Sequence, residues 1–378
     1  MPNPSGTTFD RRITLSLFRS ALSCKFESCL PLHSRFVFYG QNTLFCIATT
    51  DDSAQPGTAE GVIMKKILIT GATGQIGSEL TPLLRRRHGS DNVIAAGHRR
   101  PADPEISTTG PFYSLDIRDA AALEQIIKDH QVDTIFHLAA LLSAVAEAKP
   151  QTAWDINMNG LLNVLESARR HRCSVFFPSS IGAFGPQTPR ENTPQDTIQR
   201  PNTLYGITKV SGELLCDYYH QRYDVDTRGL RFPGLISYKT PPGGGTTDYA
   251  VEIFYAADRS QAYQCFLRPD TRLDMMYMPD ALSAMLQLMA ADIERLKHHN
   301  AFNVTAMSFT PEELVSEIRK HIPGFSVHYA TDPIRQAIAD SWPRHMDDSA
   351  AREEWGWQAE FDLPALVNDM LKHVTADR

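Results

Sequence analysis

Residues 65–77, which read KKILITGATGQIG, constrain the fold of this chain more than any other stretch. A short apolar run rich in β-branched residues ends in three glycines spaced three residues apart, so we predict a strand, a tight turn and the start of a helix. Gly71 can adopt the turn conformation, Gly74 lets the main chain approach a pyrophosphate, and Gly77 lets the helix pack closely on the strand. The helix N-terminus would then face the phosphates.

The residues after the glycines support this interpretation. Residues 75–87 carry apolar side chains at helical spacing, and a second apolar run follows at 92–96, which completes a β-α-β unit. With 378 residues and 42% hydrophobic content, the chain can bury a large core. We therefore predict an α/β protein with a doubly wound, mainly parallel (Rossmann) sheet over residues 64–235. A smaller substrate-binding lobe, residues 236–378, would pack on that sheet.

Charge and cysteine usage narrow the range of partners. The net charge of −7 gives no electrostatic reason to expect nucleic acid or an anionic membrane, and no apolar run has the length of a membrane span. The six cysteines are scattered without C-x-x-C or paired metal-ligand spacing, so we expect neither a disulfide framework nor a metal site. A reducing compartment, the cytoplasm, is the expected location.

Residues 1–63 differ from the rest of the chain. They hold half of the cysteines and show no clean periodicity, so we expect a disordered extension outside the fold. Five basic side chains against two acidic ones in the first 50 residues are compatible with an organellar transit peptide, which would place the protein in mitochondria. We favour a start codon assigned too early, because Met64 comes just before the first strand.

The end of the second strand reads Gly97-His98-Arg99-Arg100, where a dinucleotide fold usually has an acidic residue for the adenosine ribose. No carboxylate is present, and the basic side chains could hold a 2′-phosphate, which favours NADP or tolerance of both cofactors. A solvated basic loop is the alternative.

Two further strands lead toward the same ligand. A strand at 112–115 precedes Asp116, which we expect at the adenine end, and Asp119 can cap a helix over 120–129. A buried strand at 133–138 opens into the small residues of 139–143, where a flat ring or a ribose can lie against the backbone. Ser143 could instead be a helix cap.

An amphipathic helix is expected over 154–170, with its apolar side formed by Leu161, Leu162, Val164 and Leu165.

The candidate catalytic residues follow the next strand, 174–178, which delivers Ser179 and Ser180 to the carboxyl edge of the sheet. Tyr205 and Lys209 are one helical turn apart, so the ammonium can lie near the phenol and lower its pKa from about 10. That shift would suit proton abstraction from an alcohol, whose oxygen Ser180 would hold. A Tyr-x-x-x-Lys pair on its own is more often a surface pair.

The glycine loop, the serine at the strand end and the Tyr/Lys helix, in this order, resemble the extended short-chain dehydrogenase/reductase superfamily over residues 64 to about 235. Longer strings resemble its short-chain L-threonine 3-dehydrogenases. They are HLAALLS at 137–143, PSSI at 178–181, PGLIS at 233–237 and PPGGGTTDYA at 241–250, with MMYM at 275–278, AMSFTP at 306–311, IADSWP at 338–343 and DDS at 347–349.

The resemblance implies oxidation of the threonine β-hydroxyl by NAD+ to 2-amino-3-oxobutanoate. Tyr205 would be the base, Ser180 its hydrogen-bonding partner, and Lys209 would tune Tyr205 and bind the nicotinamide ribose. The implied cofactor-binding residues are Gly71, Gly74, Gln75, Ile76, Gly77, Arg99, Asp116, Ile117, Leu138, Ala139, Ala140, Asn157, Tyr205, Lys209 and Leu235. The implied substrate-binding residues are Ser143, Ser180, Tyr205, Thr246, Thr247 and Asp248, with Asp248 facing the ammonium group.

The family ordinarily has an aspartate where this chain has Gly97, so NAD is expected with NADP as an open alternative. The stretch 241–250 would be an active-site lid. Helices over 280–297 and 311–321 should belong to the smaller lobe, and the helix over 205–223, with the one before it, commonly forms a dimer interface in this superfamily. We expect a homodimer.

Two other functions remain open. A nucleotide-sugar epimerase or dehydratase uses the same Ser/Tyr/Lys site for hydride transfer, although the GGGTTD string at 243–248 argues against it. A non-catalytic protein that senses dinucleotides is the second alternative, and the intact catalytic residues argue against it.

Overall fold

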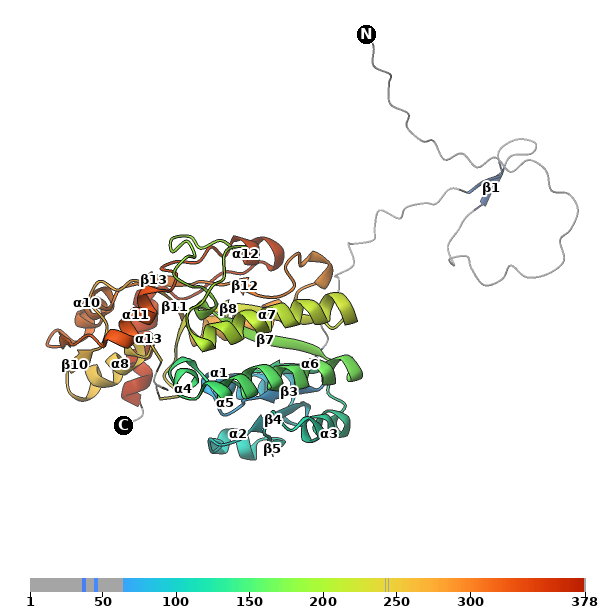
Figure 1. Cartoon of the computed structure of the whole chain (residues 1–378), viewed down its shortest axis with the longest axis horizontal. Helices are drawn as coiled ribbons and strands as arrows, with labels where there is room; N and C mark the ends of the chain where they lie inside the picture. Colours follow the sequence, from blue (N-terminus) through green and yellow to red (C-terminus); the bar gives the residue numbers. More distant parts are fainter. Residues whose placement is uncertain (1–35, 39–43, 47–63, 242, 244, 377–378) are drawn as a thin grey trace, which may run out of the picture. The chain divides into compact units, whose positions relative to one another are not determined.

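The computed structural model describes residues 36–38, 44–46, 64–241, 243 and 245–376 (Figure 1). The chain divides into two units, Met1–Thr58 and Ala59–Arg378. In the first unit, strands β1 (Phe36–Phe38) and β2 (Leu44–Cys46) form an antiparallel pair. The predictions of a disordered extension, an early start codon or a targeting segment over 1–63 fall outside the described residues. All further description concerns the second unit.

A parallel sheet of seven strands forms the centre of the second unit, in the order β12-β8-β7-β6-β3-β4-β5. The strand order reverses at β3, whose neighbours are β4 and β6, and ligands bind at such a switch point in open α/β sheets. The prediction of a doubly wound parallel sheet is confirmed. Its strands are β3 (Ile67–Thr70), β4 (Val93–Gly97), β5 (Phe112–Ser114), β6 (Thr134–His137), β7 (Ser174–Ser180), β8 (Thr227–Phe232) and β12 (Phe302–Asn303).

Helices cover both faces of this sheet because its strands are apolar on both sides. Along β3, Ile67 and Ile69 pack with α1 (Gln75–His88) and α9 (Met278–Ala290), whereas Leu68 packs with the opposite layer. The opposite layer contains α3 (Ala120–His130), α6 (Gly160–His171) and α7 (Leu204–Tyr223). As predicted, the Asp119 side chain caps α3 by accepting a hydrogen bond from the Ala122 amide.

A smaller lobe with its own apolar core lies beside the large sheet (Figure 1). Its two sheets are β9-β11-β13 (Gly234–Ile236, Leu273–Tyr277 and Met307–Phe309) and β10-β14 (Ala262–Cys265 and Ser326–Tyr329). The boundary at residue 235 remains a prediction, and α9 and β12, which follow it in the chain, return to the large sheet. The later helices are α8 (Tyr249–Arg259), α10 (Pro311–His321), α11 (Pro333–Asp340), α12 (Ser349–Trp355) and α13 (Leu363–Ala376).

Two predicted helices have different limits in the structure. The helix predicted over 154–170 is preceded by α5 (Pro150–Trp154) and begins with a π-helical turn, Asp155–Asn159, before α6. The helix predicted over 280–297 ends at Ala290 because Ala291 is extended and Asp292 caps a separate short turn, Ile293–Arg295.

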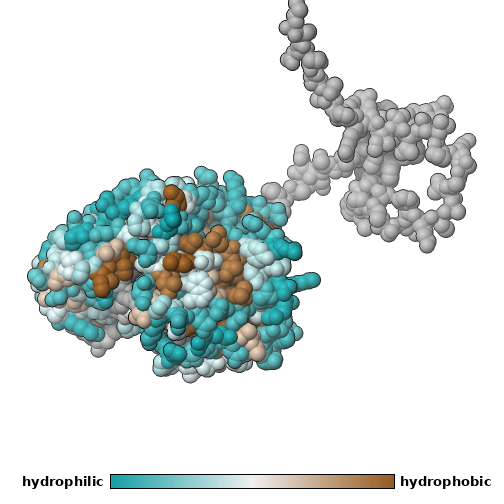
Figure 2. All heavy atoms as spheres, in the orientation of Figure 1, coloured by the Kyte–Doolittle hydropathy of each residue, from teal (hydrophilic) through white to brown (hydrophobic). Residues whose placement is uncertain are grey.

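The predicted apolar side of α6 was wrong at one position, since Leu162 is 41% exposed while its neighbour Leu161 is buried. Ile207, Leu214 and Tyr218 of α7 are also exposed, and Leu214 reaches 63%. In Figure 2, hydrophobic atoms gather on the part of the surface where Figure 1 draws these two helices. Leu214 and Tyr218 therefore contribute to an outward apolar face and not to the core, although they have helical spacing.

Candidate active site

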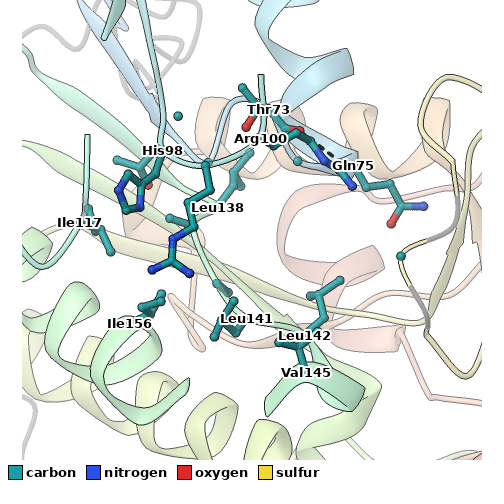
Figure 3. Close-up of a pocket in the computed structure, with 18 of the residues that line it drawn as sticks. Thr73, Gln75, His98, Arg100, Ile117, Leu138, Leu141, Leu142, Val145 and Ile156 are labelled. Carbon is teal, nitrogen blue, oxygen red and sulfur yellow. Dashed lines mark hydrogen bonds between the residues drawn. The ribbon is translucent and has the colours of Figure 1, made fainter. Parts of the chain in front are cut away.

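A cavity of about 400 Å³ lies at the carboxyl edge of the large sheet, where the strand order reverses (Figure 3). Its walls come from the glycine turn, the end of β4, the residues after β5 and the segment after β6. The predicted cofactor residues that line it are Gly71, Gly74, Gln75, Arg99, Asp116, Ile117, Leu138, Ala139 and Ala140.

The glycine turn is shaped as a phosphate site. Gly71 has a φ of +72°, and a Cβ there would lie 2.6 Å from the Ala139 amide nitrogen, so only glycine fits. Helix α1 begins at Gln75 after Gly74, with no side chain capping its N-terminus and no acidic residue in its first turn. Its first amides and the positive end of the helix dipole are therefore available to an anion at the cavity wall. The residues present fit a dinucleotide pyrophosphate.

A second cavity, of about 170 Å³, shares Gln75, Leu138, Ala140 and Asp248 with the first. It contains the three predicted catalytic residues, delivered by the end of β7 and the first turns of α7. All predicted substrate residues line it, namely Ser143, Ser180, Tyr205, Thr246, Thr247 and Asp248. Ile76 and Leu235 from the predicted cofactor set line it as well.

Each catalytic side chain is fixed by neighbouring groups. The Ser180 hydroxyl accepts a hydrogen bond from the Gly182 amide at 3.1 Å and forms a second hydrogen bond with the Tyr205 side chain. The buried Lys209 ammonium donates to the Pro178 carbonyl at 2.6 Å and lies 5.5 Å from the centroid of the Tyr205 ring. The predicted grouping of serine, tyrosine and lysine is therefore present in the folded chain.

The predicted direction of the Tyr205 pKa shift was wrong for the protein without ligand. Burial raises the pKa of Tyr205 to about 12, although the hydrogen bond with Ser180 acts in the opposite direction. Burial also lowers the pKa of Lys209 to about 8. Desolvation disfavours the charged form of both groups, and the sequence gives only their spacing and not their burial.

Two residues of the predicted cofactor set line neither cavity. Gly77 lies behind the turn, where a Cβ would be 2.4 Å from the Gly71 carbonyl oxygen, so its role is the close packing of α1. The buried Asn157 side chain accepts from the Leu141 amide at 2.8 Å and donates to the Leu141 carbonyl at 3.1 Å. Asn157 thus fixes the cavity wall after β6. Ser143 begins α4 (Ser143–Ala148) without acting as its cap, because Leu142 occupies that position.

Sequence reasoning missed Trp342, which brings a side chain from the smaller lobe into the second cavity. Trp342 belongs to the string IADSWP at 338–343, which resembles the threonine dehydrogenases, but no role was predicted for any residue of that string. Thr73 lines the first cavity without having been predicted as a contact, whereas His98 lies there as one of the basic side chains considered for a 2′-phosphate (Figure 3).

Comparisons with known proteins identify the family of this chain. The sequence profile of the NAD dependent epimerase/dehydratase family matches residues 67–305. An uncharacterised epimerase/dehydratase of Staphylococcus haemolyticus is 51% identical over 311 residues, which are 82% of this chain and 98% of that protein.

Solved structures that resemble the fold include two threonine dehydrogenases. L-threonine dehydrogenase from Clostridium difficile has a TM-score of 0.82 at 56% identity, covering 83% of this chain and 98% of that one. A monomeric L-threonine 3-dehydrogenase from a metagenome database has a TM-score of 0.79 at 44% identity, covering 82% and 99%. The family profile, the relative and the solved structures lead to one assignment: the chain belongs to the NAD dependent epimerase/dehydratase family, among the extended short-chain dehydrogenases/reductases.

Proposed function

We propose that this protein is an L-threonine 3-dehydrogenase that oxidises the β-hydroxyl of threonine to give 2-amino-3-oxobutanoate. The observation that carries the proposal is the small second cavity, in which Ser180, Tyr205 and Lys209 face a wall formed by Thr246, Thr247 and Asp248. Hydroxyl groups and a carboxylate suit the carboxylate and ammonium of an amino acid. The similarity to threonine dehydrogenases supports the same reaction.

The residues of the chain have distinct tasks in this reaction. Tyr205 in its phenolate form takes the hydroxyl proton, while Ser180 donates a hydrogen bond to the substrate oxygen as the C=O bond forms. Lys209, whose ammonium lies 5.5 Å from the centroid of the Tyr205 ring, carries positive charge below pH about 8 and in this mechanism favours the phenolate. A nicotinamide dinucleotide held along the glycine turn, Leu138 and Ala139 would supply the acceptor for the hydride of the β-carbon. The overall products are the ketone, the reduced nicotinamide and one proton.

The size of the second cavity supports this proposal over a nucleotide-sugar epimerase, which the family description leaves open. The cavity of about 170 Å³ is smaller than the 300–1,000 Å³ or so of typical pockets for drug-sized ligands. Trp342 and the stretch after Gly245 contribute to its wall. A single amino acid is therefore a better match than a nucleotide sugar.

Absorbance of reduced nicotinamide tests the proposal. The protein is mixed with L-threonine and, in parallel, with NAD+ or NADP+, and we expect sustained reduction with at least one cofactor. An epimerase would return its cofactor to the oxidised state and show no accumulation. A dinucleotide-sensing protein would bind cofactor without reducing it, so binding with no reduction would contradict the dehydrogenase.

We also propose a homodimer formed through α6 and α7, in the cytoplasm. The exposed apolar residues on these helices support the interface, whereas one similar threonine dehydrogenase is monomeric. Among the described helices, none combines the length and apolarity that crossing a membrane requires. The mitochondrial alternative depends on residues 1–63, most of which the structure does not describe.

A further inference from the structure

The end of β4 lacks the carboxylate that would bind an unmodified adenosine ribose. Gly97 occupies that position, and a Cβ there would lie 2.8 Å from Cγ2 and 3.2 Å from Oγ1 of Thr73. Thr73 therefore fills the space into which a side chain at position 97 would begin. A carboxylate at this place normally bonds to the 2′-hydroxyl, and its absence removes the repulsion of a 2′-phosphate.

Basic side chains line the same end of the 400 Å³ cavity. His98, Arg99 and Arg100 follow Gly97 directly and line its wall, and Figure 3 labels His98 and Arg100. Arg100 donates a long hydrogen bond of 3.4 Å to the Thr73 carbonyl. Within the described part of the chain, neither Arg99 nor Arg100 forms an ion pair with a carboxylate. Two arginine charges are thus available to an anion at the cavity wall.

The nearby carboxylate does not cancel these charges. Asp116 lines the cavity, but the Arg118 guanidinium bonds to both of its oxygens at 2.6–3.2 Å. This contact lowers the pKa of Asp116 to about 2, so the carboxylate is ionised and pairs with Arg118, which also pairs with Asp155 at 3.2 Å. Arg118 balances one of the two carboxylate charges of Asp116 and Asp155, so the two charges of Arg99 and Arg100 exceed the one that is left.

We propose that this end of the cavity binds a 2′-phosphate, so that the protein takes NADP+ in preference to NAD+. Arg99 and Arg100 hold the phosphate through the paired donors that guanidinium groups present to phosphate oxygens. The Thr73 side chain closes the space beside Gly97. The inference rests on the proposed function in one respect, that a nicotinamide dinucleotide occupies this cavity.

Calorimetric titration of the full chain with two adenosine fragments tests the phosphate site without any turnover. Adenosine 2′,5′-bisphosphate should bind about tenfold more tightly than adenosine 5′-monophosphate at low ionic strength, as expected for one charge-assisted contact. Added salt should reduce the difference because the arginines lie near solvent. Arg99→Ala and Arg100→Ala should each remove most of the preference, whereas Arg87→Ala, an exposed arginine of α1 outside the cavity, should keep it.

A reverse variant sharpens the test. Thr73→Ser combined with Gly97→Asp removes the crowding methyl and adds the missing carboxylate, and it should favour the monophosphate when compared with Thr73→Ser alone. Thermal unfolding checks that each variant is folded. Equal or tighter binding of the monophosphate by the unaltered protein would overturn the inference, as would an unchanged preference in both arginine variants. These outcomes are independent of whether threonine is oxidised, so failure of the dehydrogenase proposal would be recognised separately.

Discussion

The two cavities of this protein are built in different ways. The dinucleotide cavity depends largely on backbone, with a glycine turn, an uncapped helix N-terminus and strand ends as its walls. The substrate cavity depends on side chains from β7, α7, the segment around 245–248 and Trp342. A single added Cβ can therefore distort the dinucleotide cavity. In the substrate cavity, removal of one side-chain atom can abolish catalysis while the shape of the cavity stays the same.

Tyr205→Phe removes one oxygen from the substrate cavity and should have the largest effect. General acid–base catalysis contributes about 10²- to 10⁴-fold, so kcat for threonine oxidation should fall by that factor. Dinucleotide affinity should change little, since the first cavity keeps its wall. Tyr218→Phe, at a half-exposed tyrosine of the same helix, is the matched control and should retain activity. Comparable losses in both variants would contradict a catalytic role for Tyr205.

Gly71→Ala tests the backbone-built cavity. The added Cβ meets the Ala139 backbone at 2.6 Å in a left-handed conformation, so the free energy of unfolding should fall by about 1–3 kcal/mol. Urea unfolding and calorimetric titration with dinucleotide measure the two expected losses. At Gly243 a Cβ meets nothing within 4 Å, so Gly243→Ala should leave the free energy of unfolding nearly unchanged. An equally stable Gly71→Ala protein would show that the turn tolerates a side chain.

Lys209→Met removes the ammonium charge from the substrate cavity and keeps a side chain of similar length. In the natural protein, kcat/KM should rise with pH as Tyr205 loses its proton. The support from Lys209 is present below pH about 8 and is lost as its ammonium deprotonates above that value. The variant should lack this second transition and be slower by roughly tenfold near neutral pH, as for the loss of a charge interaction of about 1.4 kcal/mol. An identical pH profile in both proteins would exclude Lys209 as the group that tunes Tyr205.

Leu214→Asp should have the smallest effect on either cavity. The side chain is 63% exposed on α7, so a charge there should leave the subunit folded but disrupt a dimer formed through α6 and α7. Light scattering coupled to size-exclusion chromatography gives the mass. A natural protein that is already monomeric, or a variant that remains dimeric, would contradict the proposed interface.

Local patterns in the sequence predicted much of this architecture. The β-α-β unit follows from the spacing of Gly71, Gly74 and Gly77, and the Tyr205/Lys209 pair follows from one helical turn. Features that depend on distant contacts were not predictable. The exposure of Leu162 depends on how α6 packs, and the contact of Trp342 with the substrate cavity depends on the smaller lobe. The raised pKa of Tyr205 reflects tertiary burial, which helix spacing does not reveal.

The most direct test of the central claim is to follow the hydrogen that leaves the β-carbon. L-threonine carrying deuterium at that carbon is incubated with the protein and oxidised dinucleotide, and the products are analysed by mass spectrometry. We predict one deuterium in the reduced dinucleotide and none at the former β-carbon of the product. Reduced dinucleotide without deuterium, or no reduction by protein that binds the dinucleotide, would contradict threonine oxidation in the cavity of Ser180, Tyr205 and Lys209.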